Sequence, residues 1–364
     1  MNKSILKHEF KSSRWILLFS TIISLFTIVI FNIRLNERYE RLFRIGLRPN
    51  QAVIQDALGE TIALALLLFT ILSIIQVFMQ FRSEKDQEVG RFLKSLPLAG
   101  KEFFKVKLIT GIANITIGFI VLFIGLIAVR QANIFWIKDI YSISAYSHIF
   151  MKLDGIGTIL SYLGLTYFVV LAFYTFIFMI QYTFTNIVGA IVTGILVWLS
   201  PFFIALSLIE TISKLGRITL YDSSILNNIN TFSDKLLPWS YVVDYDFYNI
   251  GNVLYPENLG SISFISNMGL KYGITITLVI VNIFIGYKFV KNSRIEDEEK
   301  IITFKISRQI FKIGVTICTP LLVSIIITVI MGIDLNNILF IIILLLSSYL
   351  GYFISNKITK VGSR

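Results

Sequence analysis

Side chains that could carry out chemistry are few in this sequence. Histidine occurs only at His8 and His148, and neither lies in one of the long uncharged runs. A membrane protease or a metal-dependent membrane enzyme requires His, Asp or Glu side chains clustered at one site. The uncharged runs contain none of these residue types. We therefore expect no catalytic residue and no metal site.

The stretch "SLPLAGKE", residues 95–102, has the outline of a phosphate-binding loop but lacks two essential residues. Such a loop needs a glycine where Ser95 stands, and a serine or threonine where Glu102 stands. The glycine-rich backbone surrounds the phosphates, and the hydroxyl binds magnesium. We expect no ATP site and no other cofactor in this chain.

Long uncharged runs dominate the sequence, in which 55% of residues are hydrophobic and 15% are charged. A helix needs about 20 apolar residues to cross the ~30 Å hydrocarbon core of a membrane. One run, 155–209, suffices for two crossings that turn at 181–186, and a weaker run, 272–287, is long enough if the Lys288 amine extends to the headgroups. The other runs are 15–33, 61–81, 108–129, 313–333 and 335–356. We predict an all-α integral membrane protein with about eight transmembrane helices.

The basic residues predict the orientation of these helices. With both termini in the cytoplasm, 21 of the 33 Lys and Arg residues lie on the cytoplasmic side, as the positive-inside rule requires. The anionic cytoplasmic leaflet then explains the net charge of +11, so we expect contact with membrane lipid and no nucleic acid binding. Abundant Ile, Lys and Asn indicate an AT-rich genome and a multi-pass protein of the bacterial plasma membrane.

Two segments are expected on the outer side. In residues 34–48, Leu35, Tyr39, Leu42 and Phe43 share one helical face. This segment either extends the first helix along the outer surface or contacts an anionic ligand or lipid headgroup. The candidate anion contacts are Arg34, Arg38, Arg41 and Arg44. The second segment, 210–271, is a long extracellular loop that can carry short helices of its own.

Ion channels and secondary transporters usually carry ionisable side chains at membrane depth. The predicted spans carry none, and their main polar residues are Gln76, Asn114 and Asn282. Amides in such positions typically hydrogen-bond a neighbouring helix. We expect these three residues to join helices and to bind no substrate.

Residues 82–107 form the longest run of mixed charge between two predicted spans. Before Pro97, apolar residues recur at three- and four-residue steps, which predicts an amphipathic helix. Pro97 ends this helix, and a second helix begins at Lys101. The apolar face comprises Val89, Phe92, Leu93 and Leu96, and the charged face includes Glu84, Asp86 and Glu88. Because the acidic side chains disfavour anionic lipid, we expect this hairpin to bind another protein.

The sequence "FLKSLPLAGKEFFKVK", residues 92–107, resembles the cytoplasmic coupling segment of the type 2 ATP-binding-cassette exporter permeases. The matching positions are Phe92, Leu93, Ser95, Leu96, Pro97, Lys101 and Lys107. In addition, "LKHEFKSSRW", residues 6–15, is similar to the interfacial helix before the first span of that family. The resemblance covers residues 1–290, which it identifies as an exporter-permease-like transmembrane domain with a coupling hairpin at 82–107. Residues 291–364 would add a cytoplasmic connector and two transmembrane helices to the family's usual six.

The resemblance implies the permease subunit of an ATP-driven exporter. Its cargo would be amphipathic or hydrophobic, such as a peptide, antibiotic or lipid, and export could confer multidrug or antimicrobial peptide resistance. A separate ATPase subunit would bind ATP and magnesium and would hold Phe92, Leu93 and Leu96 as buried anchors. A second permease, either a copy of this chain or a related chain, would complete the transporter.

The predicted fifth span carries a face of small residues at Gly189, Ala190 and Gly194, followed by Pro201, which would kink the helix. This face suits close contact with a second permease, and it equally suits packing within one chain. An alternative function of a different class also remains, in which the chain is a membrane scaffold or sensor without transport and uses the 210–271 loop as a receptor.

Overall fold

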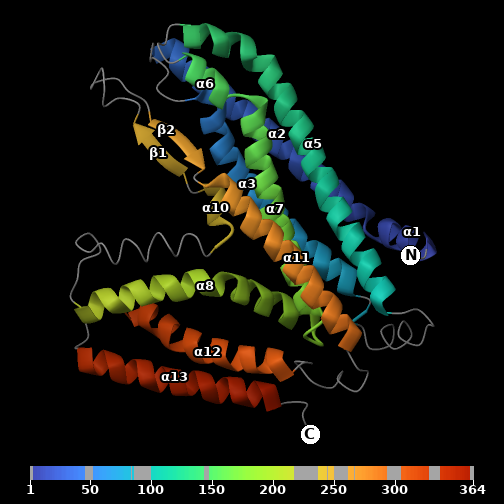
Figure 1. Ribbon diagram of the computed structural model, residues 1–364, viewed down its shortest axis with the longest axis vertical. Coiled ribbons are helices and arrows are strands. Elements are labelled where there is room, and N and C mark those ends of the chain that lie inside the picture. The colour runs from blue at the N-terminus through green and yellow to red at the C-terminus, as the bar shows by residue number, and fades with distance from the viewer. Residues whose placement is uncertain are drawn as a thin grey trace. The chain divides into compact units, whose positions relative to one another are not determined.

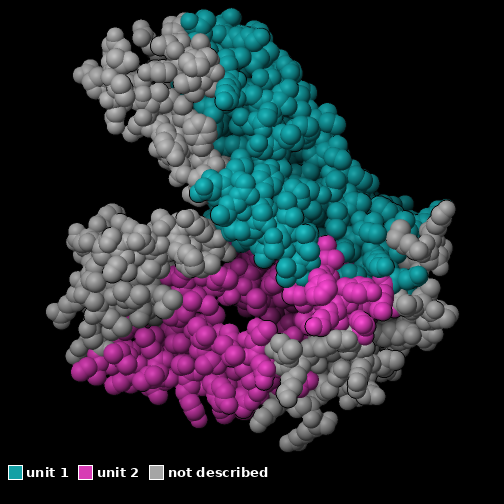
Figure 2. Space-filling model, in the orientation of Figure 1, with its two compact units in different colours: residues 1–80, 102–175, 238–281 teal, residues 81–101, 176–237, 282–364 magenta. Residues whose placement is uncertain are grey.

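The computed structural model describes residues 3–45, 52–82, 84–85, 100–142, 147–216, 237–243, 245–249, 261–265, 267–292, 305–327 and 337–360. The chain divides into two compact units (Figure 2). Unit 1 comprises residues 1–80, 102–175 and 238–281, and unit 2 comprises residues 81–101, 176–237 and 282–364.

Helices make up most of the described residues (Figure 1). The first unit begins with α1 (Lys3–Ser12) and α2 (Arg14–Ile45) and contains the short helices α6 (Ser147–Leu153) and α10 (Ser240–Val243). Helices α8 (Ile187–Gly216), α12 (Lys305–Ile325) and α13 (Asn337–Lys360) belong to the second unit. Four helices contain a boundary between the units, namely α3 (Val53–Arg82), α5 (Gly100–Ser142), α7 (Ile156–Gln181) and α11 (Met268–Asn292).

Seven helices of the described chain are long and apolar enough to cross a membrane. They lie in Arg14–Phe43, Val53–Arg82, Gly100–Ser142, Ile156–Gln181, Ile187–Ala205, Met268–Lys291 and Ile338–Thr359. The prediction of a multi-pass membrane protein is confirmed. The remaining predicted span, 313–333, falls partly on α12 and partly on residues 328–333, which lie outside the described residues.

The longest helix, α5, extends far beyond the uncharged run that predicted it. Its 43 residues would measure about 65 Å at 1.5 Å per residue, roughly twice the thickness of the hydrocarbon core. It begins at Gly100, one residue before the predicted start at Lys101, and continues past Val129 to Ser142. Charged residues near both of its ends therefore lie on the same continuous helix as the apolar middle.

The loop predicted at 210–271 contains a feature that the sequence pattern did not predict. Strands β1 (Tyr245–Asn249) and β2 (Ser261–Ile265) pair antiparallel, from Tyr245 opposite Ile265 to Asn249 opposite Ser261. The described part of the loop also includes the end of α8 and the four-residue helix α10. The described part of this loop therefore contains a two-stranded sheet as well as a short helix.

Close contacts between α2, α3 and α5 form part of the core of unit 1. Ser24 Oγ on α2 donates a hydrogen bond to the backbone carbonyl of Gly118 on α5 at 2.7 Å. A Cβ atom at Gly118 would lie only 2.9 Å from a ring carbon of Phe69 on α3. The absence of a side chain at Gly118 therefore allows these helices to approach, as small residues do in membrane helix pairs.

In unit 2, an apolar cluster surrounds the turn between α7 and α8. Its buried members are Met179, Ile180, Phe184 and Ala190, and the rings of Phe176, Phe289 and Phe311 pack against it, as does Ile285. Helices α12 and α13 lie side by side (Figure 1), and Lys312 Nζ donates to Asn356 Oδ1 at 2.8 Å. The last two predicted spans thus correspond to a packed helical pair as far as they are described.

Candidate functional site

The predicted coupling hairpin is described only at its two ends. Glu84 and Lys101 lie in the described chain, whereas Asp86, Glu88, Phe92, Leu93, Leu96 and Pro97 lie outside the described residues. Helix α3 ends at Arg82, one residue after the end of the predicted span 61–81. Helix α5 begins at Gly100, one residue before the predicted start at Lys101. The residues at these ends make specific contacts, which define the candidate functional site.

At the start of the hairpin, Lys85 binds the end of α7 within unit 2. Its ammonium donates hydrogen bonds to the backbone carbonyl of Gln181, at 2.8 Å, and to that of Phe184. The last carbonyl groups of a helix have no partner within the helix and carry partial negative charge. The Lys85 ammonium therefore satisfies the last carbonyl of α7, that of Gln181, and a second carbonyl in the turn that follows.

Aromatic rings reinforce this attachment. The ring of Phe81, at the end of α3, lies 5.2 Å from the rings of both Phe178 and Tyr182. The turn itself is fixed on its other side, because Asn186 Oδ1 accepts hydrogen bonds from the N–H groups of Val188 and Gly189 and so caps α8. The start of the hairpin is consequently attached to a well-ordered α7–α8 turn.

Beyond the hairpin, α5 is attached to α3 within unit 1. Lys107 is 3% exposed, and its ammonium donates to the backbone carbonyl of Gln80 at 2.7 Å. The Gln80 amide donates back to the carbonyl of Lys107 at 2.9 Å, and the Tyr174 hydroxyl donates to Gln80 Oε1 at 3.0 Å. We call Gln80, Lys107 and Tyr174 the lysine clamp, because the buried Lys107 ammonium and the Gln80 side chain together connect α3, α5 and α7.

The two lysines thus play similar structural roles at the two ends of the hairpin. Lys85 follows α3 and binds carbonyl groups at the end of α7, whereas Lys107 lies on α5 and binds a carbonyl near the end of α3. Lys101 lies between them within the hairpin, and its ammonium is 5.8 Å from the ring centre of Tyr287. The sequence indicated Lys101 and Lys107 through the resemblance, but it did not identify Lys85 or any of the partners.

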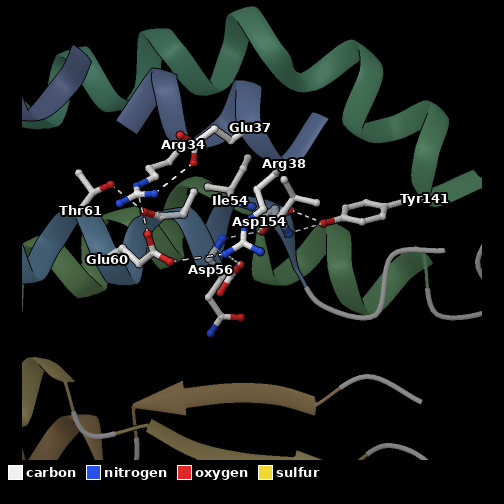
Figure 3. Close-up of polar contacts among 12 residues, drawn as sticks. Arg34, Glu37, Arg38, Ile54, Asp56, Glu60, Thr61, Tyr141 and Asp154 are labelled. Atoms are coloured by element: carbon white, nitrogen blue, oxygen red, sulfur yellow. Dashed lines mark hydrogen bonds and ion pairs between the residues drawn. The ribbon is translucent and has the colours of Figure 1, made fainter. Parts of the chain in front are cut away.

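Two of the four arginines proposed as an anion site, Arg34 and Arg38, form ion pairs with the protein itself (Figure 3). Arg34 on α2 pairs with Glu37 and with Glu60 on α3, both at 3.1 Å. Arg38 pairs with Asp56 of α3 at 2.5 Å and with Glu60 at 3.5 Å. These carboxylates offset the positive charge of Arg34 and Arg38, which would otherwise attract an anionic ligand.

Helix α2 continues through this region to Ile45, as the amphipathic pattern predicts. Leu35 is fully buried, and the rings of Tyr39 and Trp136 pack edge to face at 5.1 Å. Arg41 is exposed, and the Arg44 side chain lies outside the described residues. Anion binding by this group stays a prediction.

A second polar cluster, which the sequence reading missed, surrounds the fully buried Asp154 in the short connection between α6 and α7 (Figure 3). Asp154 Oδ1 accepts hydrogen bonds from the N–H groups of Ile54 and Gln55, both at 3.0 Å, in the first turn of α3. The hydroxyl of Tyr141 donates to Oδ2 at 2.5 Å. Asp154 therefore caps a helix that lies about 100 residues earlier in the chain.

The charge state of Asp154 follows from this environment. Burial raises the pKa of Asp154 to about 6, and the hydrogen bonds from Tyr141, Gln55 and Ile54 oppose the rise. Arg130 is also close, because its Nε donates to the backbone carbonyl of Asp154 at 2.6 Å. The carboxylate is ionised at neutral pH and is surrounded by donors.

The small residues of α8 make contacts within unit 2. Ala190 is fully buried in the apolar cluster, and a Cβ at Gly194 would lie 2.6 Å from Ile177 on α7. Gly189 has only Asn186 nearby, and Pro201 lies inside the helix. Packing within the chain therefore accounts for Ala190 and Gly194, and contact of this face with a second permease stays a prediction.

Within the described ranges, no group of three or more His, Cys, Asp or Glu side chains could hold a metal ion. Comparisons with protein-family models, curated proteins and solved structures give no match.

Proposed function

We propose that this chain is the membrane-spanning permease subunit of an ATP-driven exporter. A partner ATPase binds the 82–107 hairpin and supplies ATP and magnesium, and a second permease completes the transporter. Both termini lie in the cytoplasm of a bacterium. The cargo is amphipathic or hydrophobic, such as a peptide, antibiotic or lipid.

The attachment of Lys85 to the α7–α8 turn is the main structural support for this proposal. A coupling element must transmit displacement to the membrane helices, which requires rigid contacts at its base. Lys85 provides such a contact through the carbonyl groups of Gln181 and Phe184. The adjacent ring contacts of Phe81 with Phe178 and Tyr182 reduce the freedom of the same base.

The lysine clamp supports the proposal independently in unit 1. The reciprocal hydrogen bonds of Gln80 and Lys107 connect α3 and α5, the two helices that the hairpin joins. Tyr174 extends this connection to α7. A force applied to the hairpin would therefore reach three membrane-spanning helices through buried hydrogen bonds.

A co-purification experiment tests the proposal. The detergent-solubilised chain is purified together with the ATPase encoded beside it, as the wild type and as the Phe92→Asp/Leu96→Asp variant. We expect the wild type to retain the ATPase and the variant to lose it, because two charges would enter an apolar docking surface. The matched control is Arg91→Ala/Lys94→Ala, which changes the opposite face of the predicted helix and should retain the ATPase.

Size-exclusion chromatography and thermal unfolding of each variant show whether it is folded. The proposal fails if the wild type binds no ATPase, or if the folded Asp variant binds it as well as the wild type does. In that case the scaffold or sensor function, with the 210–271 loop as receptor, becomes the function to test.

A further inference from the structure

Several buried polar side chains on α3 and α5 have no hydrogen-bond partner among the described residues. Gln76 and Thr110 are fully buried and Asn114 is 1% exposed. Both amide atoms of Gln76, both amide atoms of Asn114 and the hydroxyl of Thr110 have no hydrogen-bond partner in the part of the protein that the structure describes. The prediction that the Gln76 and Asn114 side chains hydrogen-bond a neighbouring helix directly is therefore wrong within the described part of the chain.

Gln76 on α3 lies against the surface of α5 that carries Gly111. Thr110 and Asn114 are four residues apart on α5 and so share one face, on which Gly111 also lies. A Cβ at Gly111 would lie 2.8 Å from Gln76 Nε2 and 1.8 Å from the Tyr174 hydroxyl. The Gln76 amide and the Tyr174 hydroxyl consequently meet at the same point on the surface of α5.

The chemistry of this group identifies the kind of molecule that it could hold. The amides and the hydroxyl offer both donors and acceptors, and all three side chains are neutral. Lys107 lies one turn before Gly111 on α5, and an ammonium group so near disfavours a cation. The Lys107 ammonium already donates a hydrogen bond to the Gln80 carbonyl. It would therefore compensate a buried anion only weakly, and an uncompensated anion is unfavourable in an apolar interior.

We propose that Gln76, Thr110 and Asn114 form a buried water-binding site between α3 and α5. Water is small and neutral, and it both donates and accepts hydrogen bonds, so one or more bound waters would provide partners for all three side chains. The bound water would adjoin the Tyr174 hydroxyl and would extend the hydrogen bonds of the lysine clamp toward the middle of the helices. Unlike the proposed function, this inference requires no partner protein.

X-ray radiolysis of the wild-type protein in nanodiscs tests the site directly. A pulse produces hydroxyl radicals from bound as well as bulk water, and mass spectrometry then measures the oxidation of individual side chains. Tyr174 and its neighbour Phe173 are both fully buried, so bulk radicals reach them equally poorly. We expect Tyr174 to be oxidised at least about fivefold faster than Phe173, because only Tyr174 adjoins the proposed water.

Substitutions then assign the water to the site. The Gln76→Leu/Asn114→Leu variant removes four of the five unpartnered atoms, so oxidation of Tyr174 should fall to the rate of Phe173. The matched control is Ser73→Ala, which removes a buried hydroxyl of α3 that already donates to the Phe69 carbonyl at 2.8 Å. It should leave the oxidation of Tyr174 unchanged.

Two results would overturn the inference. If Tyr174 in the wild type is oxidised as slowly as Phe173, no water is bound at Gln76, Thr110 and Asn114. If both residues are oxidised rapidly, bulk solvent enters the helices and no discrete site exists. Both results come from the wild-type protein and do not depend on the folding of a variant.

Discussion

Lys107 and Gln80 hydrogen-bond each other twice, with the ammonium donating to one backbone carbonyl and the amide donating to the other. The carbonyl of Gln80 lies in the last turn of α3, so the buried charge of Lys107 compensates the negative end of that helix. The Lys107 ammonium and the Gln80 amide each have a hydrogen-bond acceptor. A buried charge is tolerated when it is hydrogen-bonded in this way. The pair joins the helices on either side of the 82–107 segment.

Replacement of Lys107 should destabilise the protein. Lys107→Met keeps much of the side-chain length but leaves the Gln80 carbonyl without its charged donor, so we expect a loss of about 1–3 kcal/mol. Lys105→Met is the matched control, because Lys105 is exposed on the same helix, and we expect a change within about 0.5 kcal/mol. Thermal unfolding in detergent, followed by tryptophan fluorescence, measures both. Equal stability of the two variants would contradict the structural role of the clamp.

Replacement of Lys85 should separate ATPase binding from transport. Lys85→Met removes the hydrogen bonds to Gln181 and Phe184 without changing the apolar face that is proposed to bind the ATPase. The ATPase should still co-purify, while cargo transport in proteoliposomes falls severalfold. Arg82→Met, an exposed position three residues earlier, should transport normally. Unchanged transport by the Lys85 variant would exclude this contact as part of the coupling route.

The Asp154 cluster predicts a specific pH dependence. The pKa of Asp154 is raised from 3.8 to about 6 in the folded protein, so the folded state binds the proton more tightly than the unfolded chain does. The contribution of Asp154 to stability is therefore largest below pH 4, decreases as the pH rises to about 6, and then levels. The shift corresponds to roughly 3 kcal/mol.

The difference in unfolding temperature between wild type and Asp154→Asn, measured from pH 4 to pH 8, isolates this contribution. The variant should lack the slope between pH 4 and pH 6 because asparagine does not titrate. Asp139→Asn, at an exposed position of α5, should keep the wild-type slope. A slope that persists in the Asp154 variant would assign the titration to another group.

Gly111 should tolerate no side chain. A Cβ would lie 1.8 Å from the Tyr174 hydroxyl oxygen and 2.4 Å from the ring carbon that carries it, so Gly111→Ala forces a fully buried ring to move. We expect a loss of about 1–3 kcal/mol or a failure to assemble the bundle. Gly273→Ala, where no neighbouring atom lies within 4 Å of the added carbon, should increase stability by up to about 1 kcal/mol. Thermal unfolding of the two variants compares these effects, and equal stabilities would show that Tyr174 has room to move.

Much of the architecture could be predicted from the sequence, because membrane insertion depends on local properties. Uncharged runs of sufficient length identified the seven membrane-spanning helices of the described chain, while the eighth predicted span, 313–333, is described only in part. The amphipathic pattern after Ile33 predicted that α2 continues beyond the membrane, and it extends to Ile45. Pro97 and the following turn residues predicted the start of α5 to within one residue. These features depend on neighbouring residues, whose types and spacing can be read directly.

The contacts of the candidate site depended on residues that are far apart in the sequence. Asp154 looks like an ordinary turn residue before an apolar run, yet it caps a helix that begins at Val53. The partners of Lys85 and Lys107 are backbone carbonyl groups, which every residue carries, so no sequence pattern could identify them. The sequence by itself determined which segments enter the membrane, since that depends on the summed transfer of apolar side chains. Only the tertiary structure decided which buried polar groups meet, because that depends on the packing of one helix against another.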